Sequence, residues 1–448
     1  MRTSMRARVL RSTALVAVLA LGAAGCSSSS GSGGTTAAAT SASAVTAALT
    51  KGGAITVWAW EPTLKAVVTN FEKKYPKVKV NLVNAGTGTD QYTALQNAIK
   101  AGSGVPDVAQ IEYYALPQFV LSKSITELTP YGAKSLAGTF SAGPWASVQS
   151  GGGIYGLPMD SGPMALFYNK SIFTKYHVAV PTTWAQYVVA ARELHAANPK
   201  LYITADTGDP NVVTSLIWQA GGTSFKVNGT NVTINLADQG AMKFATTWNT
   251  LISEKLLSPI SSWSDQWYKA LGDGTIATLA TGAWMPANME SGVAAGSGQW
   301  AVAPLPQWVP GAQASAESGG SSLTIPAASK NKALAYGFLQ YANAGAGVQT
   351  RLAAGGFPST TADLQSSAFL DKSIPYFGGQ KINQVLAQSA SDVVKGWSYL
   401  PFQVYANSIF NESVGQAYIG KTTMASGLKA WQDALVTYGN QQGFTVNK

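Results

Sequence analysis

The chain has 448 residues, of which 46% are hydrophobic and only 11% charged, and its formal net charge is +9 at pH 7. Basic residues are scattered, and their one cluster, over residues 73–79, lies at the polar end of an expected helix. Nucleic-acid binding requires a basic face or stripe, so the charge pattern excludes nucleic acid as the expected partner.

The first 25 residues have the pattern of a signal peptide. Four arginines, the last of them Arg11, precede an apolar run from Ala14 to Leu21 and then a stretch of small residues. This run is about half of the ~20 residues that a membrane-spanning helix needs, so we expect a cleaved leader rather than a permanent anchor. Loss of these arginines lowers the formal charge to about +5.

Cys26 is the only cysteine and directly follows Ala23-Ala24-Gly25. This context resembles a bacterial lipobox, with Ala23 at the place where such patterns favour leucine. The alternative is a lone structural thiol, but cysteines of exported proteins usually pair. We therefore expect residues 1–25 to be a lipoprotein signal peptide and Cys26 to carry the lipid. Residues 26–51, which are mostly Ser, Gly, Thr and Ala, are expected to form a flexible tether.

From Gly52 onward, strand and helix patterns alternate. Strands are expected over residues 54–60, 78–83 and 106–111, and helices over 64–74 and 92–100. Alternation of this kind predicts an α/β fold with mostly parallel sheets and flanking crossover helices. The body is longer than one usual domain, which predicts two lobes.

The later part of the chain continues with both kinds of element. Thr183 is placed to cap a helix over residues 184–197. Asn228-Gly229 separates two alternating runs, which predicts a β-hairpin. Further helices are expected at 239–255, 332–344, 382–395 and 425–438.

Candidate ligand contacts follow the expected strands, because ligands of open α/β sheets bind beyond the carboxyl ends of the strands. Trp60 and Glu61 follow the first strand, and Glu112 and Tyr113 follow the third. Asp160 follows a Tyr-Gly-Leu-Pro run. Each acid could equally be a surface charge or a helix cap. Low charge with 10% aromatic residues favours a neutral, polyhydroxylated ligand.

Patterns for catalysis or metal binding are missing from the sequence. His177 and His195 have no partner at the spacing of a zinc site, and there is no Gly-x-Ser-x-Gly motif. Residues 415–422 have the spacing of a phosphate-binding loop, but the residues before them have helical spacing instead of a buried strand. We therefore expect no catalytic residue, no cofactor and no metal.

Three blocks of sequence are diagnostic in combination: Gly153-Ile-Tyr-Gly-Leu-Pro-Met-Asp160, Leu166-Phe-Tyr-Asn-Lys-Ser-Ile-Phe173 and Val180-Pro-Thr-Thr-Trp-Ala-Gln-Tyr187. Together they resemble the family 1 extracellular solute-binding proteins, which are the maltose-binding-protein-like receptors of carbohydrate ABC importers. Similar segments continue over nearly all of residues 52–448. The resemblance implies a two-lobed, type II periplasmic-binding-protein-like fold with three hinge crossings.

The resemblance also implies how the chain is divided. The first lobe would comprise residues 52–162 plus 322–358, and the second would comprise residues 163–321 plus 359–448. The crossings would then fall near 160–166, 318–324 and 355–361, where glycines permit the change of backbone angles during closure.

The resemblance adds three site residues. Trp284 matches the aromatic residue that stacks on sugar in the family, Trp218 lies in another ligand-facing segment, and Ser321 lies in a crossing strand at the cleft. The implied protein is a monomeric, non-enzymatic sugar receptor at the outer face of the membrane. It would be attached through its lipid alone, and it would deliver a carbohydrate ligand to the permease subunits of an ABC transporter.

Two other classes of function remain open at this point. A glycan-cleaving hydrolase would need two carboxyl groups about 5 to 9.5 Å apart across the bond, and Glu61 and Glu112 are the candidate pair. A scaffold without a small ligand would leave the aromatic residues at the strand ends unexplained.

Overall fold

A computed structural model describes residues 42–448. The expected signal peptide, Cys26 and most of the expected tether lie outside these residues. No helix in the described part of the chain is both long enough and apolar enough to cross a bilayer.

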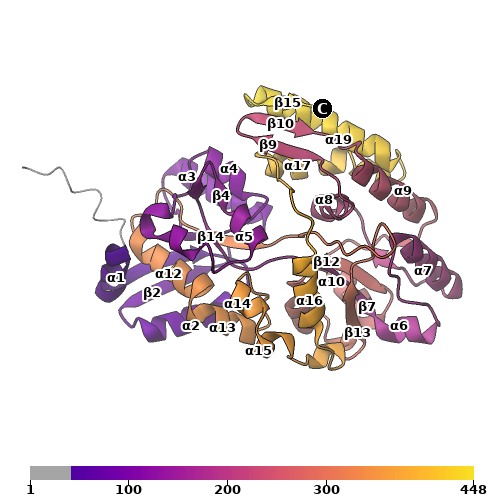
Figure 1. The fold of residues 1–448 in the computed structure, drawn as a ribbon, viewed down its shortest axis with the longest axis horizontal. Coiled ribbons are helices and arrows are strands. Elements are labelled where there is room, and N and C mark those ends of the chain that lie inside the picture. The colour runs from indigo at the N-terminus through magenta and orange to yellow at the C-terminus, as the bar shows by residue number, and fades with distance from the viewer. Residues whose placement is uncertain (1–41) are drawn as a thin grey trace, which may run out of the picture.

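The first lobe is built on a five-stranded sheet of order β2-β1-β3-β14-β6 (Figure 1). Its strands are β1 Gly53–Trp58, β2 Val78–Val83, β3 Val108–Glu112, β6 Leu157–Pro158 and β14 Ser321–Thr324. Its helices are α1 Ala42–Lys51, α2 Leu64–Lys74, α3 Thr89–Ala101, α4 Leu116–Leu121, α5 Ala142–Ser147, α12 Lys332–Ala344 and α13 Ala346–Ala353. A short two-stranded sheet joins β4 Gln149–Ser150 to β5 Gly153–Ile154.

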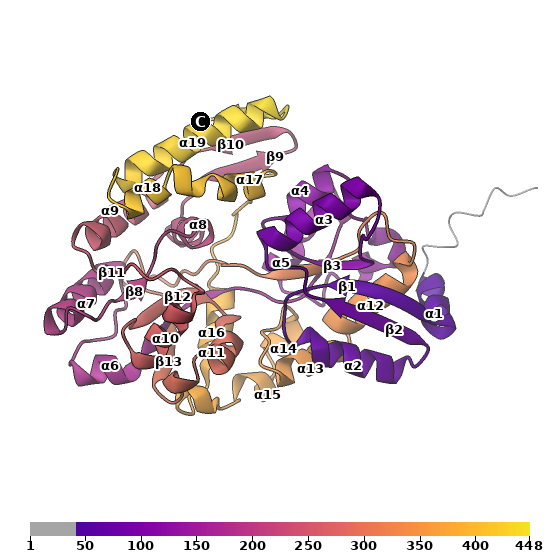
Figure 2. The ribbon, with the colours of Figure 1, turned by 180° about the vertical axis from the view of Figure 1, so that it is seen from behind.

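The second lobe contains three small sheets, with orders β12-β7-β13, β15-β10-β9 and β11-β8 (Figure 2). Their strands are β7 Met164–Asn169, β8 Thr204–Ala205, β9 Phe225–Asn228, β10 Asn231–Ile234, β11 Leu257–Ser258, β12 Thr278–Gly282, β13 Trp300–Pro304 and β15 Thr445–Asn447. The helices around them are α6 Lys170–Lys175, α7 Trp184–Ala197, α8 Pro210–Gln219, α9 Gln239–Ser253, α10 Asp265–Asp273, α11 Met285–Gly292, α14 Thr361–Leu364, α15 Ser367–Leu370, α16 Ile382–Ser391, α17 Gln403–Ser408, α18 Gly415–Tyr418 and α19 Met424–Gln441.

Three clusters of buried apolar side chains form the cores of the two lobes. One cluster takes its residues from 45–159 and 323–342 and lies in the first lobe. The other two take theirs from 164–316 and 357–435 and lie in the second. The chain therefore passes from one core to the other three times. The lobe limits given by the resemblance remain predictions, although the changes of core fall close to them.

Several elements confirm the sequence predictions. The helices α2, α7 and α12 have the predicted limits. The Thr183 hydroxyl accepts a hydrogen bond from the Gln186 backbone N–H at 3.2 Å and caps α7 as expected. The strands β9 and β10 pair antiparallel around Asn228-Gly229, as the hairpin signal predicts.

The expected tether reaches too far, because residues 42–51 form the helix α1. This stretch is rich in alanine, which favours helix, and its apolar side chains pack on α12. Val45 is only 4% exposed, and a Cβ atom on Gly337 of α12 would lie 3.0 Å from the Leu49 side chain. Burial of these side chains fixes a segment that composition alone describes as a coil.

The sheets are mixed rather than mostly parallel. The strand β1 is parallel to both β2 and β3, but β14 is antiparallel to β3 and β6, and β7 is antiparallel to β12 and β13. The chain reaches β14 by returning from the second lobe rather than through a crossover helix of the first lobe. A strand that enters the sheet from the opposite end runs antiparallel to its neighbours.

Two of the crossing segments lie directly against each other. Pro163 and Glu317 form an antiparallel bridge, and the Ser318 N–H donates to the Gly162 carbonyl at 2.8 Å. The Glu317 carboxylate accepts hydrogen bonds from the Gly162 N–H at 2.6 Å and from the Ser161 hydroxyl at 2.9 Å. A Cβ atom on Gly162 would lie 2.2 Å from the Ser318 carbonyl oxygen, so only glycine fits there.

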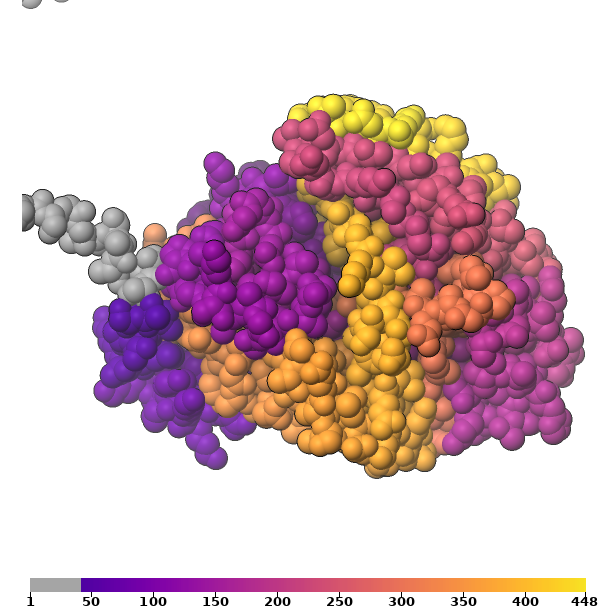
Figure 3. Space-filling model, in the orientation of Figure 1, coloured from indigo at the N-terminus to yellow at the C-terminus, as the bar shows by residue number. Residues whose placement is uncertain are grey.

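The segment between α16 and α17 covers the junction between the lobes on one face, as Figure 3 shows. The Val394 N–H donates to the Ser315 carbonyl at 3.0 Å, and the Ser315 N–H donates to the Asp392 carbonyl at 2.8 Å. Further along, Tyr399 packs against the core of the first lobe. This segment therefore contacts both lobes next to the crossings.

We expect Gly162→Ala to lower the free energy of unfolding by about 1–3 kcal/mol, because the added methyl group forces the two crossing segments apart. Gly138→Ala is the matched control, since no atom lies within 4 Å of its added Cβ. Denaturant unfolding of the two variants checks the prediction. A Gly162→Ala variant as stable as the control would contradict the close packing.

Candidate ligand-binding cleft

A cavity of about 680 Å³ lies between the two lobes. The first lobe lines it with residues at or after the ends of β1 and β3 and at the start of β14, and the second lobe with residues from β12, α8, α10 and α11. Its size falls within the range of about 300–1,000 Å³ that is typical of small-molecule sites. The cavity is therefore the candidate site.

Six of the eight predicted site residues line this cavity: Trp60, Glu61, Glu112, Asp160, Trp284 and Ser321. Their contact with a ligand remains a proposal. The strand-end rule and the motif resemblance thus lead to the same cavity from separate parts of the chain.

Tyr113 and Trp218 do not line the cavity. The Tyr113 side chain is buried, and its hydroxyl donates to the Asp160 carbonyl at 2.6 Å. The Trp218 ring stacks on Trp397 at a centroid distance of 5.2 Å, and its indole N–H donates to the Val394 carbonyl at 2.6 Å. The structure does not bring these two predicted residues to the cavity lining, because their side chains are used in packing: Tyr113 supports Asp160, and Trp218 belongs to a core of the second lobe.

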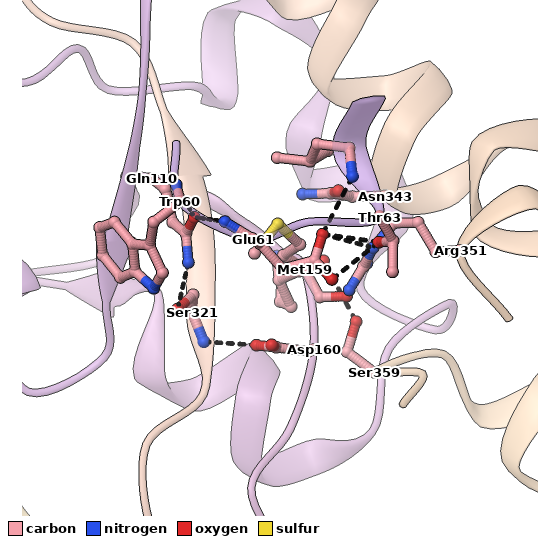
Figure 4. Close-up of polar contacts among 12 residues, drawn as sticks. Trp60, Glu61, Thr63, Gln110, Met159, Asp160, Ser321, Asn343, Arg351 and Ser359 are labelled. Carbon is pink, nitrogen blue, oxygen red and sulfur yellow. Dashed lines mark hydrogen bonds and ion pairs between the residues drawn. The ribbon is translucent and has the colours of Figure 1, made fainter. Parts of the chain in front are cut away.

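Gln110 fixes the floor of the first lobe's side of the cavity (Figure 4). Its side-chain oxygen accepts hydrogen bonds from the backbone N–H groups of Trp60 and Glu61, both at 3.1 Å. Its amide nitrogen donates to the Ser321 hydroxyl at 3.1 Å. Gln110 was not among the residues predicted from the sequence, although a glutamine within an apolar strand run indicates a buried amide that needs hydrogen-bond partners.

Asp160 joins the first crossing to the start of β14. Its carboxylate accepts a hydrogen bond from the Ser321 N–H at 2.6 Å (Figure 4). Burial raises its pKa to about 6, although the positive charge of Arg351 and the hydrogen bond from Ser321 act in the opposite direction. The Asp160 carboxylate is therefore mainly ionised at neutral pH and can accept a hydrogen bond from a ligand hydroxyl group.

Glu112 sits at the end of β3 between two tyrosines. Its carboxylate accepts a hydrogen bond from the Tyr92 hydroxyl at 2.9 Å. Burial raises the pKa of Glu112 to about 7, while hydrogen bonds from Tyr92 and Tyr114 lower it. Near neutral pH this carboxyl group exists in both forms, so it can donate a hydrogen bond or accept one.

Glu61 and Arg351 form the one ion pair of the described cavity lining. The Arg351 Nε atom lies 4.0 Å from the Glu61 carboxylate, and the guanidinium also donates to the Met159 carbonyl. Glu61 accepts further hydrogen bonds from the Thr63 hydroxyl at 2.6 Å and the Leu64 N–H at 3.2 Å. Arg351 is only 2% exposed, so its charge is committed to protein groups.

Aromatic side chains form the second lobe's wall of the cavity. The Trp284 indole N–H donates to the Ser318 carbonyl of the second crossing at 2.7 Å. Trp263 lies against it at a centroid distance of 5.7 Å and an interplanar angle of 30°, and packs on Trp267 at 5.1 Å. Trp263 is 48% exposed, so it presents the most open aromatic surface.

Trp263 also has an unusual backbone conformation, with φ at +68°. A bulky L-residue in this left-handed region is strained, and such strain is concentrated at functional sites. The sequence analysis missed Trp263, because it lies in a loop that matches neither the strand-end rule nor the quoted motifs. Among the 13 tryptophans, composition gives no reason to choose it.

Two further acids come from the second lobe. Asp209 caps α8 by accepting hydrogen bonds from the Asn211 and Val212 N–H groups, at 2.7 and 3.4 Å. Asp206 accepts from the Trp248 indole at 2.7 Å. Burial raises the pKa of both carboxyls. Asp206 directly follows β8 and its Tyr-Ile-Thr-Ala run, so the strand-end rule could have found it, whereas Asp209 follows no strand.

Within residues 42–448, no group of three or more His, Cys, Asp or Glu side chains is placed to hold a metal ion. The cavity therefore offers aromatic faces, carboxyl groups, an amide and backbone polar groups. These are the groups that bind the C–H faces and the hydroxyl edges of a polar organic ligand.

Comparison of the sequence with known proteins gives relatives that include sugar-binding proteins. An arabinooligosaccharide-binding protein of Bacillus subtilis is 27% identical over 301 residues, which are 64% of this chain and 68% of the relative. A lactose-binding protein of Rhizobium radiobacter is 26% identical over 352 residues, which are 75% of this chain and 81% of the relative.

Two solved structures are similar in fold and sequence. The ABC-transporter-associated binding protein of B. animalis subsp. lactis Bl-04, in complex with beta-1,6-galactobiose, is 45% identical with a TM-score of 0.84, over 88% of this chain and 99% of that chain. The galacto-N-biose-/lacto-N-biose I-binding protein of Bifidobacterium longum, in complex with lacto-N-biose, is 26% identical with a TM-score of 0.76, over 89% of this chain and 99% of that chain. The model of a family described as bacterial extracellular solute-binding protein matches residues 58–349. The chain belongs to this family.

Proposed function

We propose that this chain is the substrate-binding subunit of an ABC importer, and that it binds a galactose-containing disaccharide in its interlobe cleft and delivers it to the permease. The observation that carries the proposal is the cavity itself, which combines exposed aromatic faces with polar groups from both lobes. The names of three similar proteins supply the ligand class: beta-1,6-galactobiose, lacto-N-biose and lactose are all disaccharides that contain galactose.

Binding would combine stacking with oriented hydrogen bonds. Trp263 and Trp284 would cover the C–H face of a sugar ring, while Glu112, Asp160 and Asp209 would take its hydroxyl groups. Closure of the lobes about the crossings would then exclude water, and this strengthens each hydrogen bond. The same closure would present both lobes to the permease subunits.

We further propose that the protein is a monomer held at the outer face of the membrane by acyl chains on Cys26, and that it catalyses no reaction. A glycan-cleaving hydrolase is not supported, because the named relatives and the similar solved structures are sugar-binding proteins of transporters. In addition, Glu61 is tied to Thr63, Leu64 and Arg351, which leaves it poorly placed to act on a substrate.

The ligand proposal is tested by calorimetric titration with β-1,6-galactobiose, lactose and maltose. We expect saturable binding of a galactose-containing disaccharide and a rise in melting temperature, because a ligand selective for the native state stabilises it. Chromatography after overnight incubation should recover the sugar uncleaved. If none of the galactose-containing sugars binds, or if monosaccharides appear, the proposal is wrong.

Substitutions of Trp263 separate ligand contact from folding. Trp263→Ala and Trp263→Gly should both weaken disaccharide binding on the order of tenfold, because both remove the aromatic face. The glycine variant should be the more stable of the two by about 1 kcal/mol, since glycine tolerates a positive φ. Titration and denaturant unfolding of both variants check this, with Trp263→Phe as a control that keeps a ring. Unchanged affinity in the alanine variant would remove Trp263 from the site.

Substitution of Cys26 tests the anchor. We expect Cys26→Ala to abolish membrane attachment and leave disaccharide binding unchanged, because the lipid and the cleft lie on separate parts of the chain. Fractionation of cells with radiolabelled palmitate, followed by titration of the released protein, measures both. Label on the Cys26→Ala variant would show that another residue carries the lipid.

A further inference from the structure

The charges around the cavity are strongly one-sided. Among residues 42–448, five carboxyl groups line it, namely Glu61, Glu112, Asp160, Asp206 and Asp209, but only one cationic side chain, Arg351. The whole chain has 21 acidic residues and 30 lysines and arginines, so the cavity reverses the balance of the protein. From composition alone, a net positive charge would have been predicted for the cavity.

Arg351 forms an ion pair with only one of these acids, Glu61, although its charge also acts on Asp160. Its guanidinium faces Glu61 and the Met159 carbonyl, and it is almost fully buried. Among residues 42–448, the other four carboxyl groups take part in no ion pair with a lysine, arginine or histidine. Their hydrogen-bond donors are neutral hydroxyl, indole and backbone N–H groups.

The acids also lie on both sides of the cleft. Glu112 and Asp160 belong to the first lobe, and Asp206 and Asp209 belong to the second. As the lobes close, a bound ligand therefore has negatively charged carboxyl groups on both sides. An enclosed cavity of low dielectric strengthens this field, because water no longer screens it.

We infer that the cleft selects its saccharide by charge, and this inference rests on the proposed sugar-binding function. The cleft accepts neutral and amino-bearing sugars and rejects sugars with a carboxylate, sulfate or phosphate group. An anionic sugar is rejected by electrostatic repulsion, because its negative group would lie among four carboxyl groups that form no ion pair in the described structure. An ammonium group would instead supply the missing counter-charge.

The selection depends on pH, with a sign that follows from burial. Burial raises the pKa of Glu112 to about 7 and that of Asp160 to about 6, and it raises the pKa of Asp206 and Asp209. The groups that face these acids are Tyr92 and Tyr114 at Glu112, the Trp248 and Tyr418 donors at Asp206, and Arg351 and Glu61 at Asp160. The acids also raise the pKa of one another, as Asp160 and Asp209 do for Glu112 and Asp209 does for Asp206. As the pH falls from 8 to 6, Glu112 takes up a proton and Asp160 becomes partly protonated, so the rejection of anions weakens.

The experiment uses the full-length lipoprotein in detergent and calorimetric titration. The probes are β-1,6-galactobiose and three analogues that carry a carboxylate, a neutral carboxamide or an aminomethyl group in place of the C6 hydroxymethyl of the non-reducing ring. This is the only free hydroxymethyl group of the disaccharide, because C6 of the reducing ring is part of the linkage. We expect the carboxylate to bind at least tenfold more weakly than the carboxamide at pH 8, the aminomethyl analogue to bind at least as tightly, and the carboxylate deficit to shrink at pH 6.

Charge-removing variants of the same shape show whether these acids are responsible. We compare the dissociation constant of the carboxylate analogue with that of the carboxamide analogue. Glu112→Gln and Asp209→Asn should each reduce this carboxylate-to-carboxamide ratio severalfold, and the asparagine side chain can still cap α8. Glu193→Gln, on the exposed face of α7, is the control and should leave the ratio unchanged. The ratio is internal to each variant, so partial loss of affinity does not obscure it.

Two outcomes overturn the inference, and they are distinguishable. If the carboxylate and the carboxamide bind within threefold of each other at pH 8, or if neither acid variant changes their ratio, charge selection is wrong while the sugar-binding function stands. If β-1,6-galactobiose and its carboxamide both fail to bind, the proposed ligand class is wrong and the inference falls with it.

Discussion

The contact between Gly162 and Ser318 is the constraint on which the rest of the structure depends. At this point two chain segments pass between the lobes so closely that no side chain fits on Gly162. The Glu317 carboxylate holds them together through the Gly162 N–H and the Ser161 hydroxyl. A buried carboxylate is costly unless it is fully hydrogen-bonded, and burial raises the pKa of Glu317 to about 7. At this pair of segments a few atoms fix the position of both lobes.

The cavity is built outward from these segments. Asp160 precedes the first crossing and accepts the Ser321 N–H, while the Trp284 indole donates to Ser318 in the second crossing. Gln110 then joins Ser321 to the end of β1. The polar side of the cavity and its aromatic wall are thus attached to one strip of backbone. A ligand that contacts both the polar side and the aromatic wall would act directly on the crossing segments, whose conformation must change when the lobes move.

The buried acids of the cavity show how function modifies stability. Among the described residues, four of these carboxyl groups have neutral hydrogen-bond donors and no ion pair, and burial raises their pKa values. Such an arrangement would be avoided in a core built for stability alone. Hydroxyl groups of a sugar would satisfy their remaining acceptor positions. Polar groups kept in this state are a reason to expect tight and selective binding once water has been excluded.

Local signals in the sequence determined much of this protein. Periodicity gave α2, α7 and α12 with their limits, and the Asn-Gly turn gave the hairpin of β9 and β10, because these features depend on contacts between near neighbours. The strand-end rule and the motif resemblance placed six residues in the cavity. Only the tertiary structure decided the rest. The helix α1 forms because its apolar side chains are buried on α12, and β14 runs antiparallel because the chain returns to it from the other lobe. Trp218 packs on Trp397, which is far along the chain. Trp263 reaches the cavity from a loop, and Asp209 reaches it from the start of a helix. Each of these depends on residues distant in sequence, whose proximity no local pattern records.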